Sequence, residues 1–166
     1  MSTRALISVE QYLRTSYRPD CDYVDGEVVE RNVGERDHSW LQGMIIGHFL
    51  GRYKGIFVFP ELRVQVKPTR YRIPDICVFL EFPNERIPSK PPFLCLEILS
   101  PEDRMQRVQN RIDDFLEMGV PYVWVLDPKT KSAYAATAAE SLREVSSGIL
   151  RTENPVLELP LNEVFA

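Results

Sequence analysis

The stretch from residue 93 to residue 126 constrains the fold most strongly. Residues 93–99 and 122–126 are apolar runs of strand length, and residues 103–118 between them carry apolar side chains at helical spacing up to Gly119. A helix between two strands of one sheet joins them as parallel neighbours through a right-handed crossover. The pattern therefore predicts an α/β fold, a mixed β-sheet flanked by helices.

An N-terminal helix and a β-hairpin are predicted before this unit. Ser8 occupies an N-cap position with Gln11 three residues later, so a short helix is expected to about residue 15. The pair Asp25 and Gly26 interrupts a β-prone stretch, which is typical of a hairpin over residues 23–30.

Residues 37–53 are expected to form an amphipathic helix with Asp37 as its cap. Its predicted buried face consists of Leu41, Met44, Ile45, Phe49 and Leu50. Trp40 and Trp124 are both expected in the core rather than as platforms for stacked bases. Strands are predicted at 56–59, 62–66 and 73–82, with additional ones at 133–137 and 142–145.

Length and composition fit a soluble protein with one domain over residues 1–166. The chain is 44% hydrophobic and 27% charged, which is ordinary for a globular protein. No apolar run approaches the roughly 20 residues needed to cross a bilayer, and the opening MSTRALISVEQ lacks the pattern of a signal peptide, so no membrane association and a cytoplasmic location are expected. The widely spaced Cys21, Cys77 and Cys95 are interpreted as buried thiols.

Two carboxylates interrupt apolar strand-like runs. Asp75 follows Pro74 at the start of one run, and Glu97 lies inside the next. A buried carboxylate costs several kcal/mol unless it is paired or bound to a metal. If the strands are adjacent, the two side chains converge and a divalent cation can neutralise them, with oxygen ligands favouring Mg²⁺ or Mn²⁺. In the alternative interpretation, Asp75 caps a turn and Glu97 pairs with an arginine of the next helix.

These motifs, in this order, resemble those of the PD-(D/E)XK nuclease superfamily and its Uma-type family of putative restriction endonucleases. The resemblance rests on Pro74-Asp75, on residues 97–101 (EILSP) and on residues 119–128 (GVPYVWVLDP), and it spans nearly the whole chain. It implies a restriction-endonuclease-like core and a magnesium-dependent nuclease, with Mn²⁺ as a possible substitute, that acts on DNA and forms homodimers.

The chain departs from the superfamily pattern at one position. The usual lysine two residues after the second carboxylate is replaced by Leu99. Members of the family bring a basic group from the following helix, four residues before an aromatic residue, and Arg111 occupies that position before Phe115. Arginine stabilises phosphate charge through paired hydrogen bonds, but it does not act as a base.

A net charge of −4 means that nucleic-acid binding must rely on a local basic patch. Arg104, Arg107 and Arg111 fall on one side of the predicted helix and form the candidate patch for nucleic-acid contact. The alternative is a solvated helix side balanced by Glu102 and Asp103.

Other side chains are secondary candidates. Gln65 and Lys67 share one face of their predicted strand and border the metal site if that strand lies beside the Asp75 strand; otherwise they are surface residues. His38, at a helix start, is either a catalytic assistant or a structural residue. Asp22 and Glu27, around the hairpin, either add a metal ligand or solvate a turn.

Two functional hypotheses follow. In the first, the protein is a metal-dependent DNA endonuclease that uses a water nucleophile, with Asp75 and Glu97 as metal ligands and Arg111 as the phosphate-stabilising group. In the second, it is a catalytically inactive module of the same fold that binds nucleic acid or a protein partner. Leu99 and Arg111 in place of lysines, together with the acidic net charge, leave the second hypothesis open beside the first.

Overall fold

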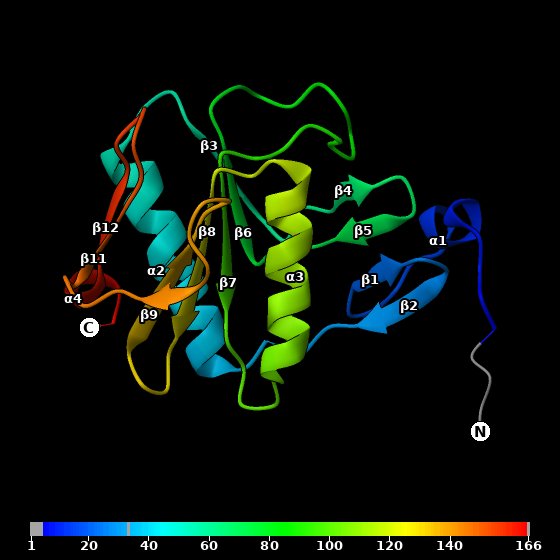
Figure 1. The fold of residues 1–166 in the computed structure, drawn as a ribbon, viewed down its shortest axis with the longest axis horizontal. Helices are drawn as coiled ribbons and strands as arrows, with labels where there is room; N and C mark the ends of the chain where they lie inside the picture. Colours follow the sequence, from blue (N-terminus) through cyan, green and yellow to red (C-terminus); the bar gives the residue numbers. More distant parts are fainter. Residues whose placement is uncertain (1–4, 33, 166) are drawn as a thin grey trace.

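The predicted strand–helix–strand unit forms the centre of the molecule. The computed structural model describes residues 5–32 and 34–165, and within it β7 (Leu94–Ile98) pairs in parallel with β8 (Tyr122–Asp127) after the helix α3 (Met105–Met118) (Figure 1). Gly119 ends α3 with a φ of 104°, a left-handed conformation that glycine adopts without a Cβ penalty. The predicted parallel pairing and helix end are confirmed.

The main sheet has six strands in the order β10-β9-β8-β7-β6-β3, and all its pairings except β7–β8 are antiparallel. The remaining strands are β3 (Phe57–Pro60), β6 (Ile76–Phe79), β9 (Ser132–Ala136) and β10 (Arg143–Glu144). The predicted mixed sheet is therefore present, although β6 covers less of the chain than the predicted strand at 73–82.

Helices α2 (Arg36–Arg52) and α3 cover opposite faces of this sheet. Alternate strand residues point to opposite faces, and they divide accordingly. Leu96 and Trp124 pack in one cluster with Phe49 of α2, whereas Cys95 and Val123 pack in another with Phe115 of α3. Because both faces are covered, the strands of this sheet can be apolar along their whole length.

A second, four-stranded sheet, in the order β2-β1-β5-β4, is formed by the N-terminal part of the chain (Figure 1). The predicted helix and hairpin are confirmed as α1 (Val9–Arg14), with its Ser8–Gln11 capping box, and the strands β1 (Cys21–Val24) and β2 (Glu27–Glu30). The strands β4 (Val64–Lys67) and β5 (Arg70–Arg72) complete the sheet, and the sequence had not indicated β5.

The C-terminal segment adds three short elements that the sequence had not indicated. The strands β11 (Ile149–Arg151) and β12 (Glu158–Pro160) form a separate two-stranded sheet, and α4 (Leu161–Val164) packs against α2. Within the described ranges, no helix has both the length and the apolar composition to cross a membrane.

Three expectations for α2 were wrong. The N-cap residue is Glu35, and the Asp37 carboxylate accepts a hydrogen bond from Arg36 instead of capping the helix. Trp124 is buried as predicted, but Trp40 is 62% exposed and Leu50 is 51% exposed. Apolar spacing along the helix did not distinguish its buried side from its outer side, because the outer side is apolar as well.

Candidate active site

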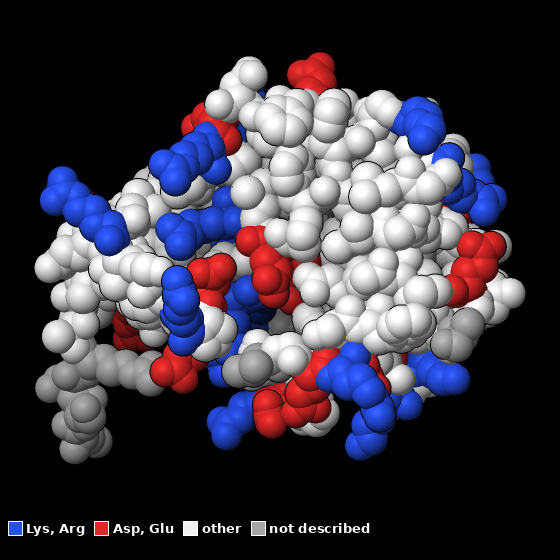
Figure 2. Space-filling view, turned by 180° about the vertical axis from the view of Figure 1, so that it is seen from behind, with Lys and Arg blue, Asp and Glu red and all other residues white. Residues whose placement is uncertain are grey.

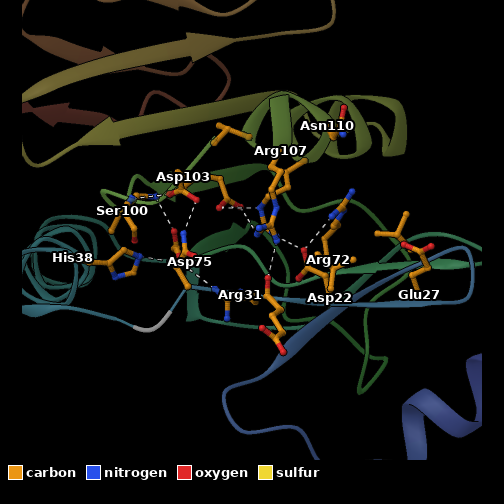
Figure 3. Close-up of a pocket in the computed structure, with 18 residues that line it drawn as sticks. Asp22, Glu27, Arg31, His38, Arg72, Asp75, Ser100, Asp103, Arg107 and Asn110 are labelled. Atoms are coloured by element: carbon orange, nitrogen blue, oxygen red, sulfur yellow. Dashed lines mark hydrogen bonds and ion pairs between the residues drawn. The ribbon is translucent and has the colours of Figure 1, made fainter. Parts of the chain in front are cut away.

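A cavity of about 200 Å³ lies where the second sheet meets the main sheet and α3. The hollow is rimmed by acidic and basic side chains in the space-filling view (Figure 2), and the close-up shows how they converge (Figure 3). The charged residues that line it are Asp22, Glu27, Glu30, Arg31, Arg72, Asp75, Glu97, Asp103, Arg107 and Arg111, together with His38.

Asp75 and Glu97 face each other across two antiparallel strands. The β6–β7 register pairs Ile76 with Leu96, so the next position along places Asp75 opposite Glu97. Side chains directly opposite each other in an antiparallel pair share one face. Both carboxylates line the cavity, and the residues are only 5% and 7% exposed. The amide of Ile98 donates to Asp75 Oδ2 at 2.7 Å and ties the start of β6 to β7.

Asp75 is also held by cationic and imidazole groups. Its Oδ1 accepts from Arg31 Nη2 at 3.0 Å and lies 3.3 Å from His38 Nε2. Burial acts to raise the pKa of Asp75, but the hydrogen bond and charge of His38, with Arg31, outweigh it and hold that pKa below its usual value. Burial acts to lower the pKa of His38, yet Asp75 raises it overall.

Glu97 is bonded through both oxygens to Arg111 of α3. Arg111 Nη2 donates to Oε1 at 2.9 Å and Nε donates to Oε2 at 3.3 Å. Burial is the largest influence on Glu97, and together with the nearby Asp75 it raises the pKa to about 7 against the opposing effect of Arg111. The pairing of Glu97 with an arginine of the following helix, left open by the sequence, is therefore present in the structure.

Arg111 reaches beyond Glu97 into a buried charge network. It donates to the Asp22 carboxylate and, at 2.8 Å, to the carbonyl oxygen of Ile73. Asp22 is 1% exposed and also accepts from Arg72 and from the backbone amide of Ile73, at 3.2 and 3.0 Å. Arg72 in turn donates to Asp114, which is 2% exposed. Basic and acidic side chains therefore alternate from Arg111 at the cavity, through Asp22 and Arg72, to Asp114 on α3.

Sequence reasoning missed Arg31, Arg72 and Asp114. A usable signal existed for Asp114, because this carboxylate follows Ile112 and precedes Phe115 on the apolar side of the predicted helix. Such a position requires a buried cation as partner. No comparable signal marks the two arginines, because they reach the site from the end of the hairpin and from β5.

The predicted site residues are only partly brought together. His38, Asp75, Glu97, Arg107 and Arg111 all line the cavity. The basic patch does not form as expected, because Arg111 points into the network, Arg104 is the N-cap residue of α3 and does not line the cavity, and Arg107 is exposed and donates to the carbonyl of Glu30.

Gln65 and Lys67 lie outside the cavity. Their strand, β4, pairs with β5 in the second sheet, whereas the neighbours of β6 are β7 and β3, so the condition on which their role depended is not met. Lys67 Nζ pairs with Glu117 at 2.5 Å, and Gln65 Nε2 donates to the Pro68 carbonyl at 3.3 Å.

Asp75 and Glu97 are the candidate donors for a divalent cation in this cavity. The described residues contain no group of three or more His, Cys, Asp or Glu side chains placed to hold a metal ion. Two carboxylates facing one cavity nevertheless match magnesium, which proteins often bind through one or two carboxylates, with water and substrate phosphate completing the shell. The residues fit such an ion if Arg111 releases at least one oxygen of Glu97.

The fold and this site define the class of protein: an α/β domain with a restriction-endonuclease-like core that presents two buried carboxylates on adjacent strands. The chain belongs to the Uma2 family, described as putative restriction endonucleases, whose model matches residues 9–163.

A solved structure supports the fold. The crystal structure of a putative nuclease belonging to DUF820 from Anabaena variabilis ATCC 29413 is similar, with a TM-score of 0.80 over 96% of this chain and 97% of that chain, at 22% sequence identity. No curated protein matches the chain.

Proposed function

We propose that this protein is a metal-dependent DNA endonuclease that hydrolyses phosphodiester bonds with water as the nucleophile. The observation that carries the proposal is the placement of Asp75 and Glu97 opposite each other in one cavity, with Arg111 reaching the same point from α3. Membership of the Uma2 family supports nuclease chemistry.

Asp75 and Glu97 are the proposed ligands of Mg²⁺, with Mn²⁺ as a substitute. When bound, the cation would activate water and offset charge on the phosphate. In its absence the buried carboxylates of the cavity are already matched by arginines: Asp22, Asp75 and Glu97 by Arg31, Arg72 and Arg111. A divalent cation adds two positive charges to this balance, so its binding is favoured when an anionic phosphodiester enters with it.

Arg111 and His38 are the proposed assisting groups. Once Arg111 turns from Glu97 toward substrate, its guanidinium can hold two phosphate oxygens and stabilise the charge that develops on them. His38 is fixed by Asp75 through Nε2, and its buried Nδ1 has no hydrogen-bond partner among the described residues. That nitrogen is available to orient a water molecule or a phosphate oxygen.

The proposal extends to partners and location. Arg107 lines the cavity and is exposed, so we assign it to DNA contact, with Arg104 one helical turn away at the start of α3. A cytoplasmic location is proposed because Cys21, Cys77 and Cys95 are all free thiols, as is usual in a reducing compartment. A homodimer is the proposed assembly, as the resemblance to the Uma-type family implies.

Plasmid cleavage tests the enzyme proposal. Supercoiled and single-stranded DNA are incubated with Mg²⁺ or Mn²⁺ and wild-type protein, Asp75→Asn or Glu97→Gln. Asp113→Asn, an exposed carboxylate on α3 outside the cavity, is the matched control. We expect metal-dependent nicking by wild type and the control and none by the two site variants. Equal cleavage by all four proteins would show a contaminating nuclease and contradict the proposal.

The second candidate is a catalytically inactive module that binds nucleic acid or a protein partner. One observation favours it: Arg111 bonds both oxygens of Glu97, where a metal would otherwise bind. Mn²⁺ binding measured by electron paramagnetic resonance, with and without a DNA duplex, separates the candidates. Uptake that Glu97→Gln abolishes supports the enzyme, whereas DNA binding without Mn²⁺ uptake supports the module.

A further inference from the structure

A second hollow, of about 660 Å³, shares a chain segment with the candidate active site. Ile73 lines this hollow, whereas Asp75, two residues later, lines the cavity described above. Glu61, also at the hollow, donates its backbone amide to the Asp75 carbonyl oxygen at 3.1 Å. Two residues of backbone span at most about 7 Å. The hollow is therefore a direct neighbour of the cavity.

Arg63 lines the hollow and carries an unsatisfied buried donor. Its Nε is buried and has no hydrogen-bond partner among the described residues, where the only other such side-chain atom is His38 Nδ1. A buried donor without an acceptor costs free energy, so nearly all such groups in native proteins have a partner. His38 lines the cavity, and Arg63 marks the neighbouring hollow as a second place where the chain itself supplies no acceptor.

The Arg63 guanidinium is held by an aromatic ring instead of a carboxylate. Its central carbon lies 4.8 Å from the centroid of the Tyr12 ring, within the range of a cation–π contact. Tyr12 is fully buried and its hydroxyl donates to the Cys21 carbonyl oxygen at 2.6 Å, so the ring is a fixed surface. No ion pair joins Arg63 to another described residue, unlike the arginines of the active-site network. A stacked guanidinium keeps the N–H groups in its plane for an anion.

The remaining charged groups of the hollow are exposed. They are two groups of opposite sign, one arginine and three carboxylates: Arg86, Asp20, Glu61 and Glu85. Water screens exposed charges, whereas the partly buried Arg63 is screened less. Glu85 already accepts from the amide and the hydroxyl of Ser89, at 3.2 and 2.6 Å. Glu61 lies 3.8 Å from Arg31. The least screened charge of the hollow is therefore positive and unpaired.

We propose that this hollow is a second anion site, in which Arg63, with Arg86 at the rim, binds a phosphate group. A guanidinium binds phosphate through paired hydrogen bonds, and a phosphate oxygen supplies the acceptor that Nε lacks. The source of the phosphate is the backbone of the nucleic-acid strand whose scissile group occupies the cavity, and this part rests on the proposed function. A free phosphate or nucleotide offers the same chemistry and is the alternative source.

NMR of the arginine side chains tests the anion site in metal-free buffer, where no cleavage occurs. Inorganic phosphate is titrated into isotope-labelled protein at constant ionic strength, with chloride as the reference anion. The Nε–H resonance of Arg63, assigned by its absence in Arg63→Lys, is expected to shift with phosphate and not with chloride. The control is Arg143, an exposed arginine of β10 that pairs with Glu140, and its resonance is expected to stay in place.

Oligonucleotide binding identifies the source of the phosphate. The affinity for a short single-stranded DNA is measured by fluorescence anisotropy in EDTA at several salt concentrations. Arg63→Gln is expected to weaken binding about tenfold and to make the slope of log affinity against log salt concentration shallower by about 0.7. Arg86→Gln, at an exposed residue outside the Tyr12 stack, is expected to act in the same direction with a smaller effect. Arg143→Gln is expected to match wild type.

Each result favours one interpretation. A phosphate-dependent shift with weaker DNA binding supports the strand as the source, and a shift with unchanged DNA binding supports a free phosphate or nucleotide. An Arg63 resonance that phosphate leaves in place would overturn the anion site. An equal loss of affinity in Arg143→Gln would assign the DNA effect to net charge alone and overturn the strand contact. None of these readouts uses cleavage, so an inactive protein would contradict the nuclease proposal and leave the phosphate site standing.

Discussion

Arg111 bonds both oxygens of Glu97, at 2.9 and 3.3 Å, although it lies on a different element 14 residues later in the chain. The strand itself offers no cation next to Glu97, because Leu99 stands where a lysine would share its face. The α3 helix therefore supplies the compensating charge. The same contact makes Arg111 both a structural partner of the buried carboxylate and the group that must move if a metal ion binds there.

Removal of the Arg111 guanidinium is expected to destabilise the fold. Its side chain is 15% exposed and is shared by Glu97 and Asp22, so Arg111→Ala leaves two buried carboxylates short of a partner. We expect a loss of about 3 kcal/mol in the free energy of unfolding at neutral pH, since breaking a buried pair from one side is costly. Arg111→Lys keeps the charge but loses the paired geometry, and its loss should be smaller.

Urea denaturation in metal-free buffer measures both variants. Arg104→Ala, at an exposed residue of the same helix that has no contact with Glu97, serves as control and should change little. An Arg111→Ala protein as stable as wild type would show that the network adds no stability.

Asp22 is expected to act as a positioning residue for Arg111. Its carboxylate accepts from Arg111, Arg72 and the amide of Ile73, so it fixes the guanidinium from the side away from Glu97. Asp22→Asn keeps the size but weakens this hold. Loss of a comparable supporting contact lowers activity about 10- to 100-fold, and we expect the fall in kcat with little change in KM.

Steady-state cleavage of a short duplex measures this effect, with Asp113→Asn as control. The melting temperature of each variant is recorded alongside. A rise in KM alone, with kcat unchanged, would instead assign Asp22 to substrate contact or to general stability.

The sequence predicted the elements whose signal is local. The β7–α3–β8 unit, the α1 capping box and the hairpin depend on periodicity or on a few adjacent residues, and all three are present. The strands β5, β11 and β12 have three residues each and are defined by pairing with distant segments. No local pattern distinguishes such short strands from loops.

Only part of the site could be predicted from the sequence. Asp75 and Glu97 were identified because a carboxylate inside an apolar run requires compensation. Arg31 and Arg72 provide much of the compensating positive charge. They lie outside any apolar run and reach the cavity only through the tertiary arrangement. The prediction that Trp40 lies in the core was wrong, because it relied on the general tendency of large apolar residues to be buried.

The stability contributed by Asp25 is expected to depend on pH. Arg70 and then Thr69 donate to its carboxylate, at 2.7 to 2.9 Å, and these bonds hold its pKa below the usual value. A depressed pKa in the folded state means a contribution that is present above the unfolded value of about 3.9 and lost as the pH falls through the folded pKa. Asp25→Asn is a suitable variant, because asparagine tolerates the φ of 49° found at this position.

Asp25→Asn should therefore be less stable than wild type at neutral pH, and the difference should shrink below a pH of about 4. The effect is modest because the side chain is half exposed. Urea titrations of the two proteins at several pH values measure the difference. A gap that stays constant to the lowest pH at which both fold would show that the Asp25 charge contributes nothing.

Cys77 and Cys95 are expected to resist thiol reagents until the main sheet opens. They lie opposite each other across β6 and β7, one position removed from Ile76 and Leu96, and both are fully buried. Burial raises the pKa of the Cys77 thiol to about 12 and that of Cys95 well above its usual value, so the reactive thiolate is scarce even where reagent could enter. With a stability of about 5 kcal/mol or more, labelling by a disulfide reagent should be at least about 1,000-fold slower than in urea. Cys77→Ala and Cys95→Ala assign the two rates. Fast labelling of either thiol in the folded protein would show that the strands carrying Asp75 and Glu97 separate locally, and the register that places these carboxylates opposite each other would then not be fixed.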